Sequence, residues 1–249
     1  MSRPRVTCDS PRVVARPRFE PMVDVAANLE DIRSRIEAAA RQAGRSASDI
    51  TLVGVTKRIP VERIRPAVDA GLLDIGENYV QEALGKQPAL GPDVRWHFIG
   101  HLQRNKVRDV VPRFHMVHSV DSVRLADEID KQAAKCGRTM PVLIEVNLGG
   151  EESKFGVARG EVAELAAHVQ GLPHVALRGL MTMPPFFEDP EEGRPFYREL
   201  RELARSIESD EPAVHLPDLS MGMTHDFEVA IAEGATFVRV GTGIFGPRD

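Results

Sequence analysis

Hydrophobic residues in this chain follow two different spacings. Val25, Leu29, Ile32 and Ile36 recur every three to four residues up to Gly44, which is the spacing of one face of an α-helix. Beyond this point, short apolar runs of strand length alternate with further segments of helical spacing. The pattern predicts an opening helix and then a chain that alternates between strands and helices.

Eight short apolar runs follow the opening helix and are predicted to be β-strands. They span residues 50–57, 73–76, 95–99, 115–118, 142–147, 176–181, 218–220 and 236–240. Helical patterns separate nearly all of them, as at 123–134, 161–169 and 197–207. Eight β/α units without an inserted domain predict a single-domain α/β fold, the (β/α)8 TIM-type barrel. A doubly wound open sheet is the alternative, but no GxGxxG dinucleotide motif follows the first strand.

Length and composition agree with a single barrel and narrow the classes of partner. The chain has 249 residues, which is a typical length for one barrel. Its formal net charge is −5, which gives no reason to expect nucleic acid or an anionic membrane as a partner. No apolar run approaches the roughly 20 residues of a membrane-spanning helix. Cys8 and Cys136 lie far apart without a CxxC motif, which suits a reducing cytoplasm. We therefore expect a soluble cytoplasmic protein.

The first 21 residues differ in composition from the rest of the chain. Arginine and proline alternate there up to Pro21, and such a segment can neither bury apolar surface nor hold a helix. Residues 1–21 are therefore predicted to be a disordered tail, and residues 22–249 the barrel domain. A basic arm that contacts nucleic acid is the alternative reading of the tail. Met22 directly precedes the opening helix and is an alternative start of the protein.

Lys57 stands at the C-terminal end of the first predicted strand, where barrels carry their functional residues. A strand aims the amine into a shared cavity, and burial beside other cations lowers the pKa of a lysine. An amine that has lost its proton attacks carbonyl carbons, so Lys57 is a candidate Schiff-base lysine. A lysine that simply ends a surface strand is the alternative.

Two loops rich in glycine and hydroxyl groups follow the last two predicted strands. Residues 220–224 are SMGMT and residues 241–243 are GTG. Barrels commonly bind phosphate at these loops, where free backbone N–H groups favour an anion. Glycine lets the backbone approach a phosphate closely, and hydroxyl groups add donors. The two loops predict a phosphate site; the alternative is that the glycines only turn the chain. The eight histidines form no HExxH or similar ligand set, so no metal site is expected.

Eight segments, in order from about Leu52 to Arg248, resemble the successive signatures of one protein family. They are VGVTKRIP, GENYVQE, WHFIGHLQRNK, HSVD, EVNLGGEESKFG, LRGLMTM, LSMGMTHDFEVAI and VRVGTGIFGPR. These segments are similar to those of the YggS-like pyridoxal phosphate homeostasis proteins. The resemblance implies a fold-type III barrel like the N-terminal domain of alanine racemase. It also implies pyridoxal 5′-phosphate as cofactor, held as a Schiff base on Lys57.

The resemblance further implies a set of cofactor-binding residues and no catalytic residue. The cofactor-binding residues are Lys57, Asn78, Ser220, Met221, Thr224, Arg239, Gly241 and Thr242. The chain departs from the family pattern in two places. Thr224 and His225 precede Asp226 where serine and aspartate are usual, and His101 stands where many relatives have proline. Threonine keeps the hydroxyl group, so we expect phosphate binding to be retained.

Arg239 bears on whether a bound cofactor is used for catalysis or only carried. Strand alternation places it on the same face as Phe237, so an inward Arg239 would meet the pyridine nitrogen. A guanidinium only donates hydrogen bonds, which keeps that nitrogen unprotonated and makes the ring a poor electron sink. The sequence ends at Asp249, and we expect no second domain that supplies a second base. An ion pair of Arg239 with Glu77 or Glu145 is the alternative.

From these observations we expect a protein of intracellular pyridoxal phosphate homeostasis that stores, buffers or delivers the cofactor without strong catalytic activity. Its partners would be pyridoxal phosphate and apo forms of enzymes that use it, and we expect a monomer. One alternative is an amino-acid racemase or related fold-type III enzyme. A second is a lysine aldolase acting on a sugar phosphate, which would also use Lys57 and a phosphate loop.

Overall fold

The computed structural model describes residues 23–150 and 155–247. The tail expected at residues 1–21 lies outside the described residues, as does Met22. Between residues 23 and 150 and between 155 and 247, no helix is both long enough and apolar enough to span a membrane.

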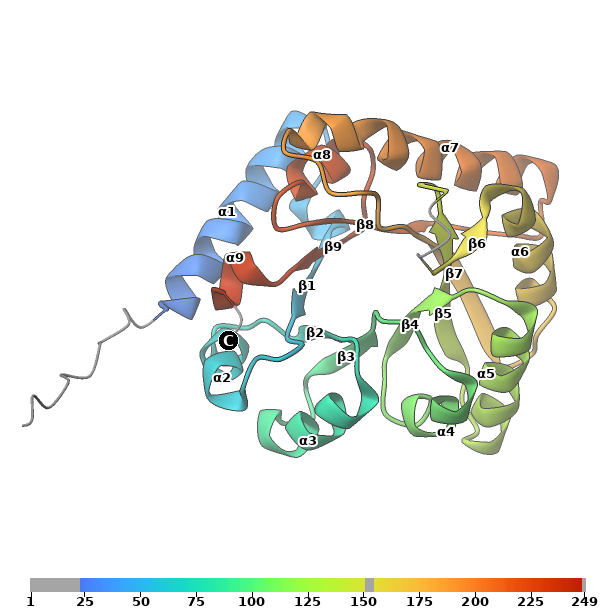
Figure 1. The fold of residues 1–249 in the computed structure, drawn as a ribbon, viewed down its shortest axis with the longest axis horizontal. Coiled ribbons are helices and arrows are strands. Elements are labelled where there is room, and N and C mark those ends of the chain that lie inside the picture. The colour runs from blue at the N-terminus through green and yellow to red at the C-terminus, as the bar shows by residue number, and fades with distance from the viewer. Residues whose placement is uncertain (1–22, 151–154, 248–249) are drawn as a thin grey trace, which may run out of the picture.

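Eight parallel strands form a closed barrel in the described part of the chain (Figure 1). They are β1 Thr51–Val55, β2 Asp74–Glu77, β3 Arg95–Phe98, β4 Met116–Val120, β5 Met140–Asn147, β7 Val175–Met181, β8 Asp218–Met223 and β9 Phe237–Val240. Pairing of β1 with β9 and of β4 with β5 closes the ring. A two-residue strand, β6 (Val157–Ala158), pairs with the end of β5. The predicted TIM-type barrel is confirmed, and the open-sheet alternative is wrong.

Helices surround the barrel on its outer side (Figure 1). They are α1 Val25–Gln42, α2 Val61–Asp69, α3 Val80–Leu90, α4 Val107–Val110, α5 Val123–Lys135, α6 Val162–Gln170, α7 Arg194–Asp210, α8 Phe227–Ala232 and α9 Thr242–Phe245. Short 3-10 turns are η1 Ala47–Asp49, η2 Arg104–Lys106, η3 Arg159–Glu161 and η4 Pro190–Gly193. The predicted opening helix is α1, which begins after the N-cap Asp24 and packs against α8 and α9. Its four periodic apolar residues are all buried, as their spacing predicts.

Strand alternation divides the core into two apolar regions. The larger region lies between the strands and the helices, and a smaller one fills the barrel interior. The interior residues are Val53, Met116, Leu143, Met181 and Phe237. Buried polar side chains share the interior with them, among them His97, His118 and Arg239. The interior is therefore not uniformly apolar, and the polar part connects to the site described below.

Two of the strand ends that differ from the sequence-based boundaries bear on the site. β1 ends at Val55, so Lys57 lies in the following turn rather than in the strand. β8 continues to Met223, and most of the predicted glycine-rich loop is therefore strand. Gly222 has φ of +88°, and a Cβ there would lie 2.6 Å from the Cβ of Ala230. Gly222 thus accommodates a shift in the pairing register of β8 with β9, which occurs between Ser220 and Met223. From the sequence alone, this glycine is instead predicted to be part of a loop.

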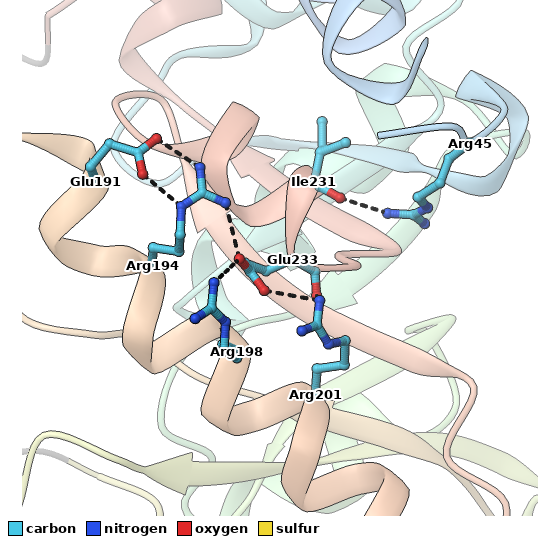
Figure 2. A network of polar contacts seen from close by, with 7 residues as sticks. All are labelled: Arg45, Glu191, Arg194, Arg198, Arg201, Ile231 and Glu233. Carbon is cyan, nitrogen blue, oxygen red and sulfur yellow. Dashed lines mark hydrogen bonds and ion pairs between the residues drawn. The ribbon is translucent and has the colours of Figure 1, made fainter. Parts of the chain in front are cut away.

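Helix α7 is tied to the rest of the barrel through one carboxylate. Glu233 directly follows α8 and is 4% exposed. Its carboxylate lies 3.0, 3.1 and 2.9 Å from guanidinium nitrogens of Arg194, Arg198 and Arg201, all on α7 (Figure 2). Burial opposes ionisation, but these hydrogen bonds and charges lower the pKa of Glu233. The cluster joins α7 to the segment that leads into β9.

Candidate functional site

A pocket of about 270 Å³ opens where the strands end at their C-terminal side. Six of the eight residues predicted to bind cofactor line it, namely Lys57, Asn78, Thr224, Arg239, Gly241 and Thr242. These residues follow or end β1, β2, β8 and β9, so closure of the barrel brings them together. Sequence reasoning did not select Val55 and Ile99 in the apolar part of the wall. Apolar residues at strand ends have no distinctive spacing that would mark them as pocket residues.

The backbone on both sides of Lys57 is held by helix α3. Nζ of Lys86 donates to the carbonyl oxygen of Thr56 at 2.8 Å, and the backbone N–H of Arg58 donates to Glu82 at 2.8 Å. Lys86 and Glu82 also pair with each other at 3.1 Å. Arg58 has φ of +59°, a strained value for a residue with a side chain. Glu82 and Lys86, here called the α3 clamp, therefore fix the turn that carries Lys57.

The α3 clamp rests on a buried carboxylate. Oε1 of Glu77 accepts from Nζ of Lys86 at 2.7 Å and from the hydroxyl of Thr56 at 2.7 Å. Burial raises the pKa of Glu77, and the bonds from Lys86 and Thr56 oppose that rise. Its other oxygen, Oε2, is buried without a hydrogen-bond partner among the described residues. The sequence gives no sign of this role for Lys86, because a helical lysine is usually exposed.

Arg239 enters the barrel interior from β9 and is 4% exposed. Nη1 donates to the hydroxyl oxygen of Ser220 at 2.6 Å, and Nη2 donates to the carbonyl oxygen of Thr182 at 3.0 Å. Burial lowers the pKa of Arg239, and the charges of Tyr197 and Glu145 act in the opposite direction. These two hydrogen bonds leave further N–H groups of the guanidinium for a ligand in the pocket.

Glu145 is one of the two acidic residues that the sequence named as an alternative partner of Arg239. It is 5% exposed on β5, and its charge acts on Arg239 through space. Burial, together with the charge of Asp121, raises the pKa of Glu145 to about 7, and Arg239 opposes this rise. Glu145 can therefore gain or lose a proton near neutral pH.

The hydroxyl group of Thr224 lies within hydrogen-bonding distance of several donors at the N-terminal end of α9. Its hydroxyl oxygen accepts from the backbone N–H groups of Gly241 at 3.3 Å and Gly243 at 3.4 Å, and lies 3.3 Å from the hydroxyl of Thr242. These contacts are long, so a better acceptor can take over the same donors. Asp226 holds the turn between β8 and α8, which carries Thr224, by accepting from the backbone N–H of Met223 at 2.7 Å.

Ser220 and Met221 lie away from the pocket wall. The hydroxyl of Ser220 is buried in the barrel interior, between Arg239 and His118. The side chain of Met221 is fully buried in the core between strands and helices. Because β8 continues through these residues, their side chains alternate between the two faces of the sheet. Their binding role remains a prediction, and for Ser220 any action on a ligand would pass through Arg239.

The two departures from the family pattern have definite places. His225 lines the pocket, and its Nε2 lies 2.9 Å from the carbonyl oxygen of Glu188. His101 stacks on the ring of Phe155, with 3.9 Å between the ring centroids, and lies 3.3 Å from Asp121.

Asn78 also lines the pocket, and its Oδ1 is buried with no hydrogen-bond partner in the described part of the chain. No group of three or more His, Cys, Asp or Glu among the described residues is arranged to hold a metal ion.

Comparison with known proteins agrees with this geometry. The family model described as alanine racemase, N-terminal domain, matches residues 27–249. The chain is 49% identical to the pyridoxal phosphate homeostasis protein of Aquifex aeolicus, covering 88% of this chain and 96% of that protein. It is 42% identical to the protein of the same name from Escherichia coli K12, over 92% of this chain and 98% of the relative.

Solved structures also include a protein similar to this chain that binds pyridoxal phosphate. PipY of Synechococcus elongatus, solved with pyridoxal phosphate bound, superposes with a TM-score of 0.80 at 35% identity, covering 90% of this chain and all of that one. An alanine racemase of Clostridium difficile has a TM-score of 0.66 at 15% identity, covering 88% of this chain and 56% of that one, which shows a shared fold alone. With identities of 42 and 49% over most of their length, the chain belongs to the pyridoxal phosphate homeostasis protein family.

Proposed function

We propose that this protein binds pyridoxal 5′-phosphate in the pocket and serves its intracellular homeostasis by storing, buffering or delivering it. One observation carries the proposal. A single pocket brings together the amine of Lys57, the guanidinium of Arg239 and the donors around Thr224. These three groups match the carbonyl, the ring nitrogen and the phosphate of one ligand.

The residues present fit each part of that ligand. The backbone N–H groups of Gly241 and Gly243, together with the hydroxyls of Thr224 and Thr242, provide donors for a phosphate. Lys57 is held by the α3 clamp at the mouth of the barrel, where its amine can bond to an aldehyde carbon. The buried, unpartnered Oδ1 of Asn78 is an acceptor that a ligand hydroxyl can satisfy.

The same geometry favours carriage of the cofactor over catalysis with it. When bound, pyridoxal phosphate supplies an electrophilic carbonyl and a ring that can accept electrons. Arg239 can only donate to the ring nitrogen and so leaves it unprotonated, which weakens the ring as an electron sink. The hydrogen bonds to Ser220 and Thr182 hold the guanidinium in place.

Weak amino-acid racemisation is the second candidate function, and Glu145 is the observation that favours it. A racemase must remove and return a proton, and Glu145 has a pKa of about 7 close to Arg239. Measured interconversion of amino-acid enantiomers above the rate of free pyridoxal phosphate would support this function. A rate equal to that of the free cofactor leaves carriage as the activity.

Reduction of the purified full-length protein with borohydride tests the main proposal. We expect a mass increase that matches reduced pyridoxal phosphate, attached at Lys57 and absent in Lys57→Ala. Lys131→Ala is the matched control, because Lys131 is exposed on α5 and pairs only loosely with Glu128 at 3.7 Å. An adduct that persists in Lys57→Ala places the cofactor on another lysine. An adduct that forms only with an added sugar phosphate indicates an aldolase instead.

Delivery requires a separate experiment. The loaded protein is mixed with the apo form of an enzyme that uses pyridoxal phosphate, and recovery of that enzyme's activity is followed. We propose that recovery is faster than with the same concentration of free cofactor in the presence of a scavenger for free pyridoxal phosphate. If the scavenger slows recovery equally with the loaded protein and with free cofactor, the function is restricted to storage and buffering.

Sedimentation of the loaded protein by itself tests the proposed monomer.

A further inference from the structure

A continuous line of hydrogen-bonded side chains runs through the interior of the barrel and ends at Arg239. Its members come from four strands and are all buried; they are Asp74, His97, His118 and Ser220, here called the polar relay. Nε2 of His97 lies 2.9 Å from Asp74, and Nδ1 of His97 lies 2.9 Å from Nε2 of His118. Nδ1 of His118 lies 3.0 Å from the hydroxyl of Ser220, which accepts from Arg239 at 2.6 Å.

With both imidazole rings neutral, the chemistry of the two ends determines every proton position in between. The carboxylate of Asp74 can only accept, so Nε2 of His97 carries a proton. A neutral His97 then accepts at Nδ1, which requires a proton on Nε2 of His118. Nδ1 of His118 in turn accepts the hydroxyl proton of Ser220, whose remaining lone pairs face the donating Arg239. All the hydrogen bonds of the polar relay therefore run in one direction, from Arg239 to Asp74.

Burial and charge support a neutral ring at His118 in the polar relay. His97 is 1% exposed and His118 is fully buried. Burial lowers the pKa of His118 well below its usual range, and the charge of Arg239 acts in the same direction. At the far end, burial would raise the pKa of Asp74, but hydrogen bonds from His97 and Arg95 lower it to about 2. The only other ionisable neighbour in ring contact with His97 among the described residues is the exposed His115, at 5.6 Å.

The two ends of the polar relay open on different faces of the barrel. Asp74 and Arg95 line a hollow of about 260 Å³ at the N-terminal ends of β1 and β2, where Nε of Arg95 donates to Asp74 at 2.7 Å. Arg239 lines the pocket at the opposite, C-terminal side. Apolar side chains, among them Met116 and Phe237, share the barrel interior with the polar relay.

We propose that the polar relay positions Arg239 for the ring nitrogen of the ligand, an assignment that rests on the proposed function. The hydroxyl proton of Ser220 is committed to His118, so its lone pairs are oriented toward one nitrogen of Arg239. A guanidinium fixed at Nη1 and Nη2 presents its other N–H groups in one direction. Without His118 as acceptor, the hydroxyl can rotate and Arg239 loses its oriented acceptor.

Nitrogen-15 NMR of the full-length protein without cofactor tests the polar relay independently of binding. We expect each of His97 and His118 to carry a proton on Nε2 and none on Nδ1. His115→Gln is the matched control and should leave both tautomers unchanged, because the ring of His115 packs edge-on against His97 and no hydrogen bond joins the two rings in the described part of the chain. A cationic ring, or a proton on Nδ1 of either residue, would overturn the proposal.

Replacement of His118 tests the effect on Arg239. His118→Leu removes the acceptor, and we expect pyridoxal phosphate to bind about tenfold more weakly, with an altered absorbance spectrum. His118→Asn places an oxygen near the position of Nδ1 and should restore much of the affinity. Ser220→Ala gives a second route to the same loss, should His118→Leu fail to fold. Wild-type affinity and spectrum in Ser220→Ala would overturn the proposal. Wild-type protein that shows the expected tautomers but binds no pyridoxal phosphate contradicts the proposed function instead.

Discussion

Nζ of Lys86 lies 2.7 Å from Oε1 of Glu77, in a pair that is almost completely removed from solvent. The side chain of Glu77 is fully buried and that of Lys86 is 10% exposed. The same ammonium group holds the carbonyl of Thr56, the residue before Lys57. A buried ion pair therefore supports the turn on which the proposed covalent chemistry depends.

Replacing Lys86 with methionine leaves the carboxylate of Glu77 buried without its cation. We expect the free energy of unfolding to fall by roughly 3 to 5 kcal/mol, because an uncompensated buried charge is strongly unfavourable. Urea denaturation of the cofactor-free protein measures this change. Lys131→Met, which breaks an exposed pair, should change stability by less than about 1 kcal/mol. Equal effects of the two substitutions would contradict a supporting role for Lys86.

Replacing Thr224 with valine keeps the shape of the side chain but removes its hydroxyl. We expect pyridoxal phosphate to bind about tenfold more weakly, because one phosphate donor is lost. Pyridoxal, which has no phosphate, should bind with the same affinity to both proteins. Equilibrium dialysis of both ligands provides the measurement. An equal loss for both ligands would place the phosphate elsewhere.

The stability of the protein should depend on pH through Glu145. Its pKa rises from 4.5 to about 7 on folding, so the folded form holds the proton more tightly. The resulting stabilisation is fully present below about pH 4.5 and is lost as the pH rises through about 7. Glu145→Gln carries no charge at any pH, so it should be more stable than wild type by roughly 3 kcal/mol at pH 8.

Urea midpoints at pH 5 and pH 8 separate this effect from a general change in packing. The difference between Glu145→Gln and wild type should be small at pH 5 and should grow toward pH 8. A constant difference across this range would show that Glu145 does not titrate with a raised pKa.

Glu233→Gln should weaken the attachment of α7. Three arginines of that helix converge on this carboxylate, and the amide provides only one acceptor for them. We expect a loss of roughly 2 to 3 kcal/mol in the free energy of unfolding. Glu202→Gln is the matched control, because Glu202 is exposed on the same helix. In Glu233→Gln, we expect faster amide hydrogen exchange in α7 alone. Unchanged exchange in α7 would contradict a role of Glu233 in attaching this helix.

The sequence by itself determined the architecture and the position of Lys57. Apolar spacing is a local property, so eight strands with helices between them were predicted correctly from short segments such as 95–99 and 142–147. The C-terminal ends of parallel strands meet at one rim, so the sequence alone places Lys57 and Asn78 near Gly241. The family resemblance then supplied the cofactor and its contact residues.

Only the tertiary structure decided which side chains support these residues. His118 and Ser220 are separated by 102 positions and meet only because the barrel closes. Lys86 resembles any helical lysine in the sequence, yet packing buries it against Glu77. Strand β8 continues to Met223 through the register shift at Gly222, so Ser220 lies in the barrel interior rather than at the rim. Long-range pairing and burial are properties of the closed barrel, and local spacing along the chain carries no record of them.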